Sequence, residues 1–451
     1  MYKKGIQGVE LSKIKVIVSV LVVFNLSACG GGSGTPAAAG DEEAVVSAIQ
    51  RVSIATDGTE SNIRSVKPVV SQDGRYVVYS SESATLVADD TNMSSDIFMF
   101  DTQTRITTRV SVGNDGSEAN GHIFDPAISA DGRYIVFESR ASNLVANDLN
   151  SSMDVFLRDT QLNTTTLVSK SSDGTQGGSA SLNADISADG RYVIYQSFST
   201  NLVANDTNVG VDIFKFDTQT SITTRVSLAN NGSESNLDSF NAAISADGRY
   251  VVFEANATNL VIGDLNMSED IFLRDTQLNT TILVSKASDG SQGDLYSYEP
   301  DISADGRYVV YASIASTLVA NDTNMAIDVF KHDILTGITT RISVASDGAE
   351  SNLDSSGANM SADGRYIVFE SIASNLVPNI SNLVSNIFVR DTMTNTTTLV
   401  SKAYDSTQGN QYSIESEISA DGNFVVFTSV SSNLVSGDTN NVDDVFHVSR
   451  P

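Results

Sequence analysis

The sequence has few of the residues that usually build reactive sites. A single cysteine, Cys29, occurs among 451 residues, so no intrachain disulfide can form. The three histidines, His122, His332 and His447, fall at unrelated places in the chain, which gives no sign of a histidine-ligated metal. Tryptophan is absent, which excludes an Asp box ending in Trp. There is no G-x-S-x-G segment either, so no hydrolase nucleophile elbow is indicated.

Basic residues are also scarce. The chain has 27 Lys and Arg against 55 Asp and Glu, a formal net charge of -28. Such a surface repels nucleic-acid phosphates, so we expect no nucleic-acid partner. It attracts cations or basic partners and keeps the protein soluble. With only six Pro and 31 Gly, the chain does not have a low-complexity composition.

An Asp-Gly pair recurs along the chain at a fixed interval of 58 residues. A constant period of this length predicts a propeller, a solenoid or another array. Asp-Gly between apolar runs is typical of a tight hairpin, because Gly adopts positive φ without steric cost. We therefore interpret these aspartates as turn residues rather than catalytic ones. The pairs begin at Asp73, Asp131, Asp189, Asp247, Asp305, Asp363 and Asp421.

Each repeat contains four short strand patterns and no helical period. In the second repeat they cover residues 126–129, 134–139, 154–158 and 165–169. The turns around Asp131 and after residue 158 are short. The connections after the second and fourth strands are long. Four antiparallel strands per repeat form one propeller blade.

The two ends of the chain predict how the ring closes. The last repeat stops after its third strand, at residues 444–448, and the missing fourth strand is found at residues 51–54. Fourth strands alternate between an Arg type (Arg109, Arg225, Arg341) and a Leu type (Leu167, Leu283, Leu399). Arg51 is of the Arg type, as blade seven requires. We expect an all-β, seven-bladed β-propeller of 58-residue repeats, closed by pairing of the N- and C-terminal strands, which removes exposed sheet edges.

The repeat also carries a family resemblance. Residues 128–133 (ISADGR) together with residues 154–159 (DVFLRD) look like TolB-type, WD40-like β-propeller repeats. The resemblance covers about residues 48 to 449 and implies the propeller fold. TolB has an additional N-terminal domain and six blades, whereas this chain has an N-terminal tether and seven. Because this fold serves many functions, the resemblance implies less about activity.

The N-terminus reads as a lipoprotein signal. Four lysines precede an apolar run from residue 16 to 24, and Leu26-Ser27-Ala28-Cys29 follows. This stretch resembles the bacterial lipobox, which implies cleavage before Cys29 and lipidation of that residue. The alternative is an ordinary signal peptide with an incidental cysteine. In the lipoprotein pattern of Gram-negative bacteria, a residue other than Asp directly after the cysteine implies the outer membrane. The residue here is Gly30, so we expect the outer membrane, on its periplasmic side or its surface. The expected organisation is a signal peptide at 1–28, a flexible tether at 29–44 and the propeller at 45–451.

A D-x-N-x-x-x-D pattern lies in the long loop between the second and third strands of six blades. Oxygen ligands at this spacing suit Ca²⁺, which makes it the candidate cofactor, although three side chains are too few and the spacing is not that of an EF-hand. The alternative is Asx-turn capping of the loop. Blade six departs, with Ile380, Asn382 and Asn386. The residues are Asp90, Asn92, Asp96, Asp148, Asn150, Asp154, Asp206, Asn208, Asp212, Asp264, Asn266, Asp270, Asp322, Asn324, Asp328, Asp438, Asn440 and Asp444.

Two further features lie in the long connections. A Leu-Val pair precedes the acidic pattern in all seven blades and is expected to tuck the loop against its blade. The connections between blades carry aromatic residues that either stack on a ligand or cover the end of the core. These aromatics are Phe124, Phe240, Tyr296, Tyr298 and Tyr412.

Together these patterns favour a non-catalytic, lipid-anchored protein of the cell envelope. We expect a monomer that is held at the membrane through Cys29. It is expected to bind an envelope protein or a polysaccharide through the face that carries the long loops. The alternative is a Ca²⁺-dependent carbohydrate-active enzyme or carbohydrate-binding propeller that uses acids in the central mouth. A structural repeat with optional Ca²⁺ stabilisation is a third possibility. No catalytic residues are assigned.

Overall fold

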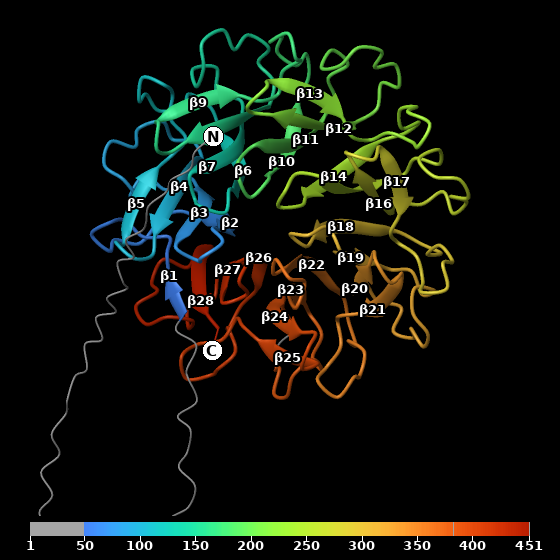
Figure 1. Cartoon of the computed structure of the whole chain (residues 1–451). Helices are drawn as coiled ribbons and strands as arrows, with labels where there is room; N and C mark the ends of the chain where they lie inside the picture. The colour runs from blue at the N-terminus through green and yellow to red at the C-terminus, as the bar shows by residue number, and fades with distance from the viewer. Residues whose placement is uncertain (1–48, 382, 451) are drawn as a thin grey trace, which may run out of the picture. The chain divides into compact units, whose positions relative to one another are not determined.

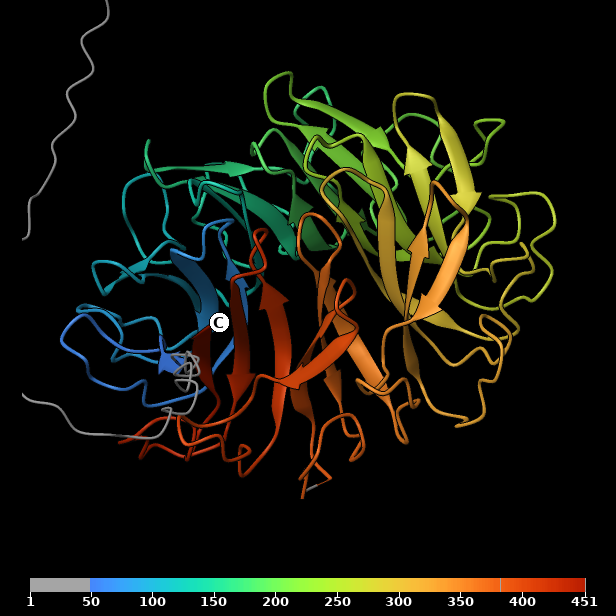
Figure 2. The same ribbon diagram turned by 60° about the horizontal axis from the view of Figure 1, so that its bottom comes forward.

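The computed structural model describes residues 49–381 and 383–450. Twenty-eight strands form seven four-stranded antiparallel sheets that are arranged around one centre (Figure 1). The predicted seven-bladed, all-β propeller is therefore confirmed. Figure 2 shows the same ring tilted, with connecting loops projecting beyond the ends of the strands. The signal peptide, the tether, Cys29 and Asn382 lie outside the described residues.

The first four blades are complete in chain order. Blade 1 contains β2 (Ser65–Val70), β3 (Tyr76–Ser81), β4 (Asp96–Asp101) and β5 (Ile106–Arg109). Blade 2 contains β6 (Ile123–Ile128), β7 (Tyr134–Ser139), β8 (Asp154–Asp159) and β9 (Thr164–Leu167). Blade 3 contains β10 (Ser181–Ile186), β11 (Tyr192–Ser197), β12 (Asp212–Asp217) and β13 (Ile222–Arg225). Blade 4 contains β14 (Ser239–Ile244), β15 (Tyr250–Ala255), β16 (Asp270–Asp275) and β17 (Thr280–Leu283).

The last three blades complete the ring. Blade 5 contains β18 (Ser297–Ile302), β19 (Tyr308–Ser313), β20 (Asp328–Asp333) and β21 (Ile338–Arg341). Blade 6 contains β22 (Ser355–Met360), β23 (Tyr366–Ser371), β24 (Asn386–Asp391) and β25 (Thr396–Leu399). Blade 7 contains β26 (Ser413–Ile418), β27 (Phe424–Ser429), β28 (Asp444–Ser449) and β1 (Ile49–Arg51). The order of blade 7 is β1-β28-β27-β26, so its outer strand comes from the other end of the chain.

The pairing of β1 with β28 confirms the predicted closure. The two strands are antiparallel, with Ile49 opposite Val448 and Arg51 opposite Phe446. β1 ends earlier than expected because the next residues leave the ladder. The Ser53 hydroxyl then replaces a backbone acceptor and receives a hydrogen bond from the Val445 N–H at 3.1 Å. Ser169 does the same for Val155 in blade 2, where β9 also ends two residues before the predicted boundary.

The core lies between neighbouring blades. Each of seven clusters of buried apolar side chains draws on two adjacent blades, and the first joins blade 7 to blade 1 through residues such as Val445 and Phe98. The Leu of each Leu-Val pair is 1% exposed, so the loops are tucked in as predicted. The buried leucines are Leu86, Leu144, Leu202, Leu260, Leu318, Leu376 and Leu434.

A glycine contact fastens each blade to its neighbour. The ring of Tyr134 in blade 2 packs on Gly190, the turn glycine of blade 3, so closely that a Cβ there would lie 2.1 Å from Cδ2. The Arg133 guanidinium stacks 4.7 Å over the same ring and forms an ion pair with Asp159 at 2.6 Å. The same packing of an aromatic ring on the turn glycine of the next blade occurs in every blade. Where the ring of blades closes, Phe424 packs on Gly74.

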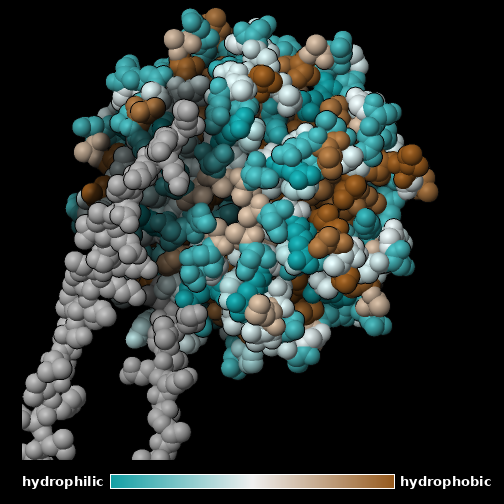
Figure 3. All heavy atoms as spheres, in the orientation of Figure 1, coloured by the Kyte–Doolittle hydropathy of each residue, from teal (hydrophilic) through white to brown (hydrophobic). Residues whose placement is uncertain are grey.

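The surface has the polarity that the composition predicts. Figure 3 shows a mainly hydrophilic face with apolar side chains between the polar ones. In residues 49–381 and 383–450, no helix is long and apolar enough to cross a membrane.

Candidate functional site

The innermost strand of every blade contains a bulge. In blade 2 the register shifts between Phe124 and Ala127, and the same shift occurs in all seven blades. In each blade the first of the two residues inside the shifted segment has positive φ, from 40° to 56°. Six of these seven residues are not glycine. Such strain persists only where the surrounding structure enforces it, and it is concentrated at functional positions. These residues are Lys67, Asp125, Asn183, Asn241, Glu299, Gly357 and Glu415.

The bulge explains why the predicted first strand was too short. The bulge at Asp125 interrupts the alternation of apolar and polar residues in the sequence. The alternation alone therefore predicts a strand that starts at Pro126. β6 in fact starts at Ile123. Phe124, Phe240 and Tyr298 consequently lie within first strands rather than in the connections between blades, which corrects their predicted placement.

The remaining two aromatic candidates do lie in the connections. Tyr296 is 52% exposed and Tyr412 is 37% exposed. The Tyr412 hydroxyl donates to Asp443 Oδ1 at 2.7 Å, which ties it to the neighbouring long loop. Phe124 is half-buried and stacks on His122 with ring centroids 6.0 Å apart. A ligand-binding role for these five aromatic residues stays a prediction.

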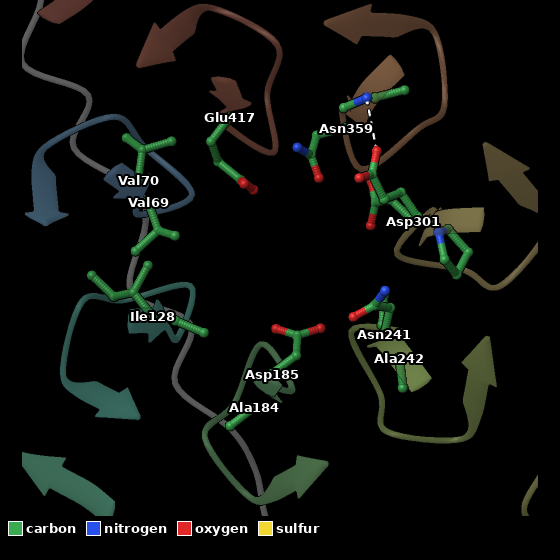
Figure 4. Close-up of a pocket in the computed structure, with 16 residues that line it drawn as sticks. Val69, Val70, Ile128, Ala184, Asp185, Asn241, Ala242, Asp301, Asn359 and Glu417 are labelled. Carbon is green, nitrogen blue, oxygen red and sulfur yellow. Dashed lines mark hydrogen bonds between the residues drawn. The ribbon is translucent and has the colours of Figure 1, made fainter. Parts of the chain in front are cut away.

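Two residues beyond each bulge, a second set of side chains lines the central channel. It surrounds a cavity of about 380 Å³. Figure 4 shows Asp185, Asp301 and Glu417 pointing into the same hollow from different blades, with Asn241 and Asn359 beside them. Val69, Val70 and Ile128 lie between Glu417 and Asp185 and are across the hollow from Asp301 (Figure 4). The set at this position is Val69, Ala127, Asp185, Ala243, Asp301, Asn359 and Glu417.

Two of these carboxylates also join neighbouring blades. Asp185 accepts the Ile186 N–H at 2.7 Å and, from blade 4, the Ile244 N–H at 3.0 Å. Asp301 repeats this arrangement with Ile302 at 2.7 Å and, from blade 6, Met360 at 2.9 Å. Glu417 receives no hydrogen bond from any described residue. One channel carboxylate is therefore free of structural partners.

Burial raises the pKa values of these three acids, and repulsion by neighbouring carboxylates adds to the shift for Asp301 and Glu417. Burial raises the pKa of Asp185 to about 6, although two backbone N–H groups oppose the shift. Burial, with a smaller contribution from Asp185, raises the pKa of Asp301 to about 7. The pKa of Glu417 lies well above its usual range because of burial and the charges of Asp301 and Asp185. The group titrates as a coupled set, so its protonation responds to any cation that enters.

The wider mouth of the channel is also acidic. A second cavity of about 460 Å³ shares Asn241, Glu299, Asn359 and Glu417 with the first, so the two are continuous. Lys67 is the one basic residue among those that line it. Its Nζ lies 3.8 Å from both Asp125 Oδ1 and Glu415 Oε1, which leaves the mouth with excess negative charge.

Second strands supply caps for the strained bulges. Glu138 accepts the backbone N–H of Asn183 in the next blade. Glu254 accepts that of Glu299 at 3.0 Å, and Glu370 accepts that of Glu415 at 2.6 Å. Burial is the largest cause that raises the pKa of Glu138 to about 8 and those of Glu254 and Glu370 to about 7. These side chains fix the bulges in place, and Glu370 also lines the mouth.

The acidic loop patterns proposed for Ca²⁺ are bridged by donors of the protein itself. In blade 1, Arg109 Nη1 lies 3.3 Å from Asp90, 3.6 Å from Asp96 and 2.6 Å from Glu118. Asn92 Oδ1 accepts the Ser94 N–H at 2.9 Å, which is an Asx turn.

In blades 2 and 4 leucine stands at the position of this arginine, and a glutamine of the following connection bridges the acids instead. Gln176 Nε2 donates to Asp148 at 2.8 Å and to Asp154 at 2.9 Å. The Arg and Leu types of fourth strand thus alternate together with Glu and Gln in the following connection. Among the described residues, no group of three His, Cys, Asp or Glu is placed to hold a metal ion. Ca²⁺ binding at the loops stays a prediction.

The channel acids were missed by sequence reasoning, although a signal was present. Asp185, Asp301 and Glu417 are each two repeats apart, at a position where the other blades carry Val, Ala or Asn. The acids of the loops give a stronger sequence signal, because their pattern occurs in six blades. Comparing the repeats column by column for the least uniform polar position would have found the channel.

Comparison with known proteins supports the fold and no more. The chain matches no protein-family profile and no curated protein. The solved oligogalacturonate lyase of Vibrio parahaemolyticus is similar, with a TM-score of 0.54 and 14% identity over 91% of this chain and 95% of that one. The TolB structure of Acinetobacter baumannii is also similar, with a TM-score of 0.42 and 15% identity over 72% of this chain. The chain spans 63% of that TolB chain. At 14% identity the likeness to the lyase structure shows the fold alone.

Proposed function

We propose that this protein is a lipid-anchored, non-catalytic propeller of the cell envelope that binds a basic segment of a partner protein. The binding site is the channel mouth on the face that carries the long loops. The observation that supports this proposal is the composition of the mouth, where several carboxyl groups face one already paired lysine. A cleft lined by one sign of charge between low-dielectric walls focuses its field and raises the local concentration of oppositely charged ligands.

Binding to a partner is measurable with the purified protein on a support. We expect one envelope protein to be retained at a defined ratio from a solubilised envelope extract, and to be released as ionic strength rises. Asp125→Asn removes a mouth carboxylate that forms an ion pair with Lys67. This change should weaken capture about two- to fivefold, as expected for a partly exposed charge pair.

A matched control separates the mouth from the rest of the acidic surface. Asp89 is an exposed acid in a long loop. It has positive φ, which asparagine accepts, so Asp89→Asn changes the net charge equally without straining the fold. Capture that drops equally in both variants, or that is insensitive to salt, would count against the mouth as the binding site. Repeating the capture with Ca²⁺ and with chelator tests the loop prediction in the same experiment.

Membrane attachment is the second part of the proposal. Cys29 follows Leu26-Ser27-Ala28 and is the one cysteine of the chain, which supports lipidation at this position. Cys29→Ser should move the protein from the membrane fraction to the soluble envelope fraction. Fractionation that is the same for the variant and the parent would contradict the anchor.

A carbohydrate-active enzyme is the second candidate function. The observation in its favour is the group of neighbouring carboxyls with raised pKa values, because a protonated and an ionised carboxyl side by side can act as acid and base. An acidic channel repels polyuronates, so a neutral glycan is the better substrate to screen. Release of reducing ends that is lost in Glu417→Gln would favour this candidate over the binding protein.

A further inference from the structure

The strand order places both ends of the propeller chain on one face. The first and third turns of every blade lie on the same face, which we call the short-turn face, and the long loops project from the opposite face. β1 starts at Ile49 opposite Val448, near the last residue of β28 (Figure 1). At the other end of the chain, the Arg450 N–H donates to the carbonyl of Asn423 in a first turn at 2.7 Å. The chain that precedes Ile49 therefore joins the propeller at the short-turn face.

The short-turn face carries a ring of exposed apolar side chains. Each of blades 1 to 6 places at least one of them at its third turn or at the start of its fourth strand. In blade 7 the two chain ends stand where the other blades have their third turn. Because the blades repeat one structure around a common centre, side chains at equivalent positions can contact a single flat surface together. These residues are Ile106, Leu162, Ile222, Leu278, Leu335, Ile338 and Met393.

Charges of opposite sign balance on the short-turn face. In its first and third turns and at the end of its third strand, each of blades 1 to 6 has two aspartates and two basic residues, and blade 7 has one of each. The whole chain has 27 Lys and Arg against 55 Asp and Glu, so the excess of acid lies on the long-loop face and in the channel. The aspartates are Asp73, Asp101, Asp131, Asp159, Asp189, Asp217, Asp247, Asp275, Asp305, Asp333, Asp363, Asp391 and Asp421. The basic residues are Arg75, Arg105, Arg133, Arg158, Arg191, Lys215, Arg249, Arg274, Arg307, Lys331, Arg365, Arg390 and Arg450.

Charge and connectivity distinguish the two faces toward a membrane. Apolar side chains alone do not, because loop tips such as Met93, Val209 and Met325 are exposed on the long-loop face. A bilayer with anionic lipids repels the acidic long-loop face, whereas the neutral short-turn face can approach it. About 20 residues separate Cys29 from Ile49, so a lipid on Cys29 keeps the short-turn face at a high local concentration near the bilayer.

We propose that the short-turn face lies against the bilayer, with its ring of apolar side chains in the interfacial layer and the long-loop face turned away from the membrane. Apolar side chains beside a polar surface are buried about 5–10 Å deep in the layer between headgroups and acyl chains. This orientation rests on the lipid anchor of the proposed function. It leaves the channel mouth open to a partner protein on the side away from the membrane.

An introduced tryptophan reports on one face at a time, because the chain has none of its own. Leu335→Trp and Met325→Trp place it on opposite faces of blade 5, at positions that are 77% and 92% exposed. The lipidated protein is bound to vesicles of phosphatidylethanolamine and phosphatidylglycerol whose acyl chains are brominated. We expect the bromolipid to quench Leu335→Trp about twofold, with emission shifted to shorter wavelength, and to leave Met325→Trp unchanged.

Residues found at the same positions of other blades provide variants that test the apolar contact without impairing the fold. Blade 1 carries Gln103 and Thr104 in its third turn, and both are exposed. The triple variant Leu162→Thr, Leu278→Thr, Met393→Gln, made in the short-turn reporter, should reduce the quenching by about half and melt like its parent. Raising the ionic strength should leave the quenching of the unmodified reporter unchanged, because the face is neutral.

The possible failures are distinguishable. Quenching of Met325→Trp alone, equal quenching of both reporters, or quenching of neither on a vesicle-bound protein would overturn this orientation and leave the anchor intact. Quenching that is lost at high ionic strength would overturn the apolar contact. A shift in Leu335→Trp emission that appears without vesicles and grows with protein concentration would assign the face to a second copy of the chain. Failure of the lipidated protein to bind vesicles, together with unchanged fractionation of Cys29→Ser, would overturn the anchor and this orientation together.

Discussion

The contact between Tyr134 and Gly190 provides a sharp test of how the blades are held together. Gly190→Ala places a Cβ 2.1 Å from Cδ2 of Tyr134 and 2.7 Å from Cγ, so the ring or the turn must move. The ring cannot swing out freely, because Arg133 stacks on it and is held by Asp159. The expected loss of stability therefore has a conformational part and a packing part.

The magnitude of each part can be worked out from the structure. Gly190 has φ of +72°, and an L-residue in this region costs about 1–2 kcal/mol. The forced overlap with the ring adds about 1–3 kcal/mol, as for other overpacked sites. Gly174→Ala is a matched control, since Gly174 has φ of +90° but nothing within 4 Å of its added Cβ. We expect about 2–5 kcal/mol for Gly190→Ala and about 1–2 kcal/mol for Gly174→Ala.

Urea unfolding is the suitable assay. It should be followed by circular dichroism and by tyrosine fluorescence, because the chain has no tryptophan. Coincidence of the two transitions is needed before a free energy is derived. In a Tyr134→Ala background the packing part should vanish, so that Gly190→Ala then costs only about 1–2 kcal/mol. Equal losses for Gly190→Ala and Gly174→Ala in the wild type would refute the reasoning.

Three further predictions concern closure, loop pairing and pH. Deleting β1 should destabilise the propeller severely, because β28 would become an unpaired edge; a deletion variant that melts like the parent would rule out this closure. Arg109→Leu should cost about 3 kcal/mol, because Asp90, Asp96 and Glu118 lose the one cation that lies among them, although Ser111 and Asn92 still donate to Asp96 and Thr91 to Glu118. Adding Glu118→Gln should restore much of the loss, because it recreates the Leu and Gln combination of the even blades, and failure of this rescue in thermal melts would contradict the proposed alternation. The pKa of Glu417 is higher in the folded than in the unfolded protein, so the folded state binds more protons between about pH 4 and neutral pH, and its stability falls as pH rises through that window. Glu417→Gln should therefore gain stability relative to the wild type between about pH 4 and about pH 8 in urea unfolding, and a constant difference would count against the raised pKa.

The same titration has a consequence for binding. Cations favour ionised carboxylates, so affinity for a basic segment should rise with pH as Asp185 and Asp301 lose their protons near pH 6 and 7. If the segment displaces protons from these acids, the apparent heat of binding should also depend on the ionisation enthalpy of the buffer.

Much of the architecture was determined by the sequence alone. The 58-residue spacing from Asp73 to Asp421 specified seven blades, and the Arg type at Arg51 specified which end completes the ring. Both follow from local chemistry. Asp-Gly turns and short apolar strands form the same hairpins wherever they occur, and an unpaired strand at each end can be satisfied only by the other.

The candidate site was decided by the tertiary structure. A bulge, invisible as a pattern, starts β6 at Ile123 and places Asp125 at positive φ. Ring closure then brings Asp185, Asp301 and Glu417, which lie two repeats apart in sequence, to one hollow that also has apolar side chains on its wall. Their raised pKa values depend on how fully seven blades exclude water, and on distances between blades. No local segment contains that information, because charge repulsion and desolvation act through space rather than along the chain.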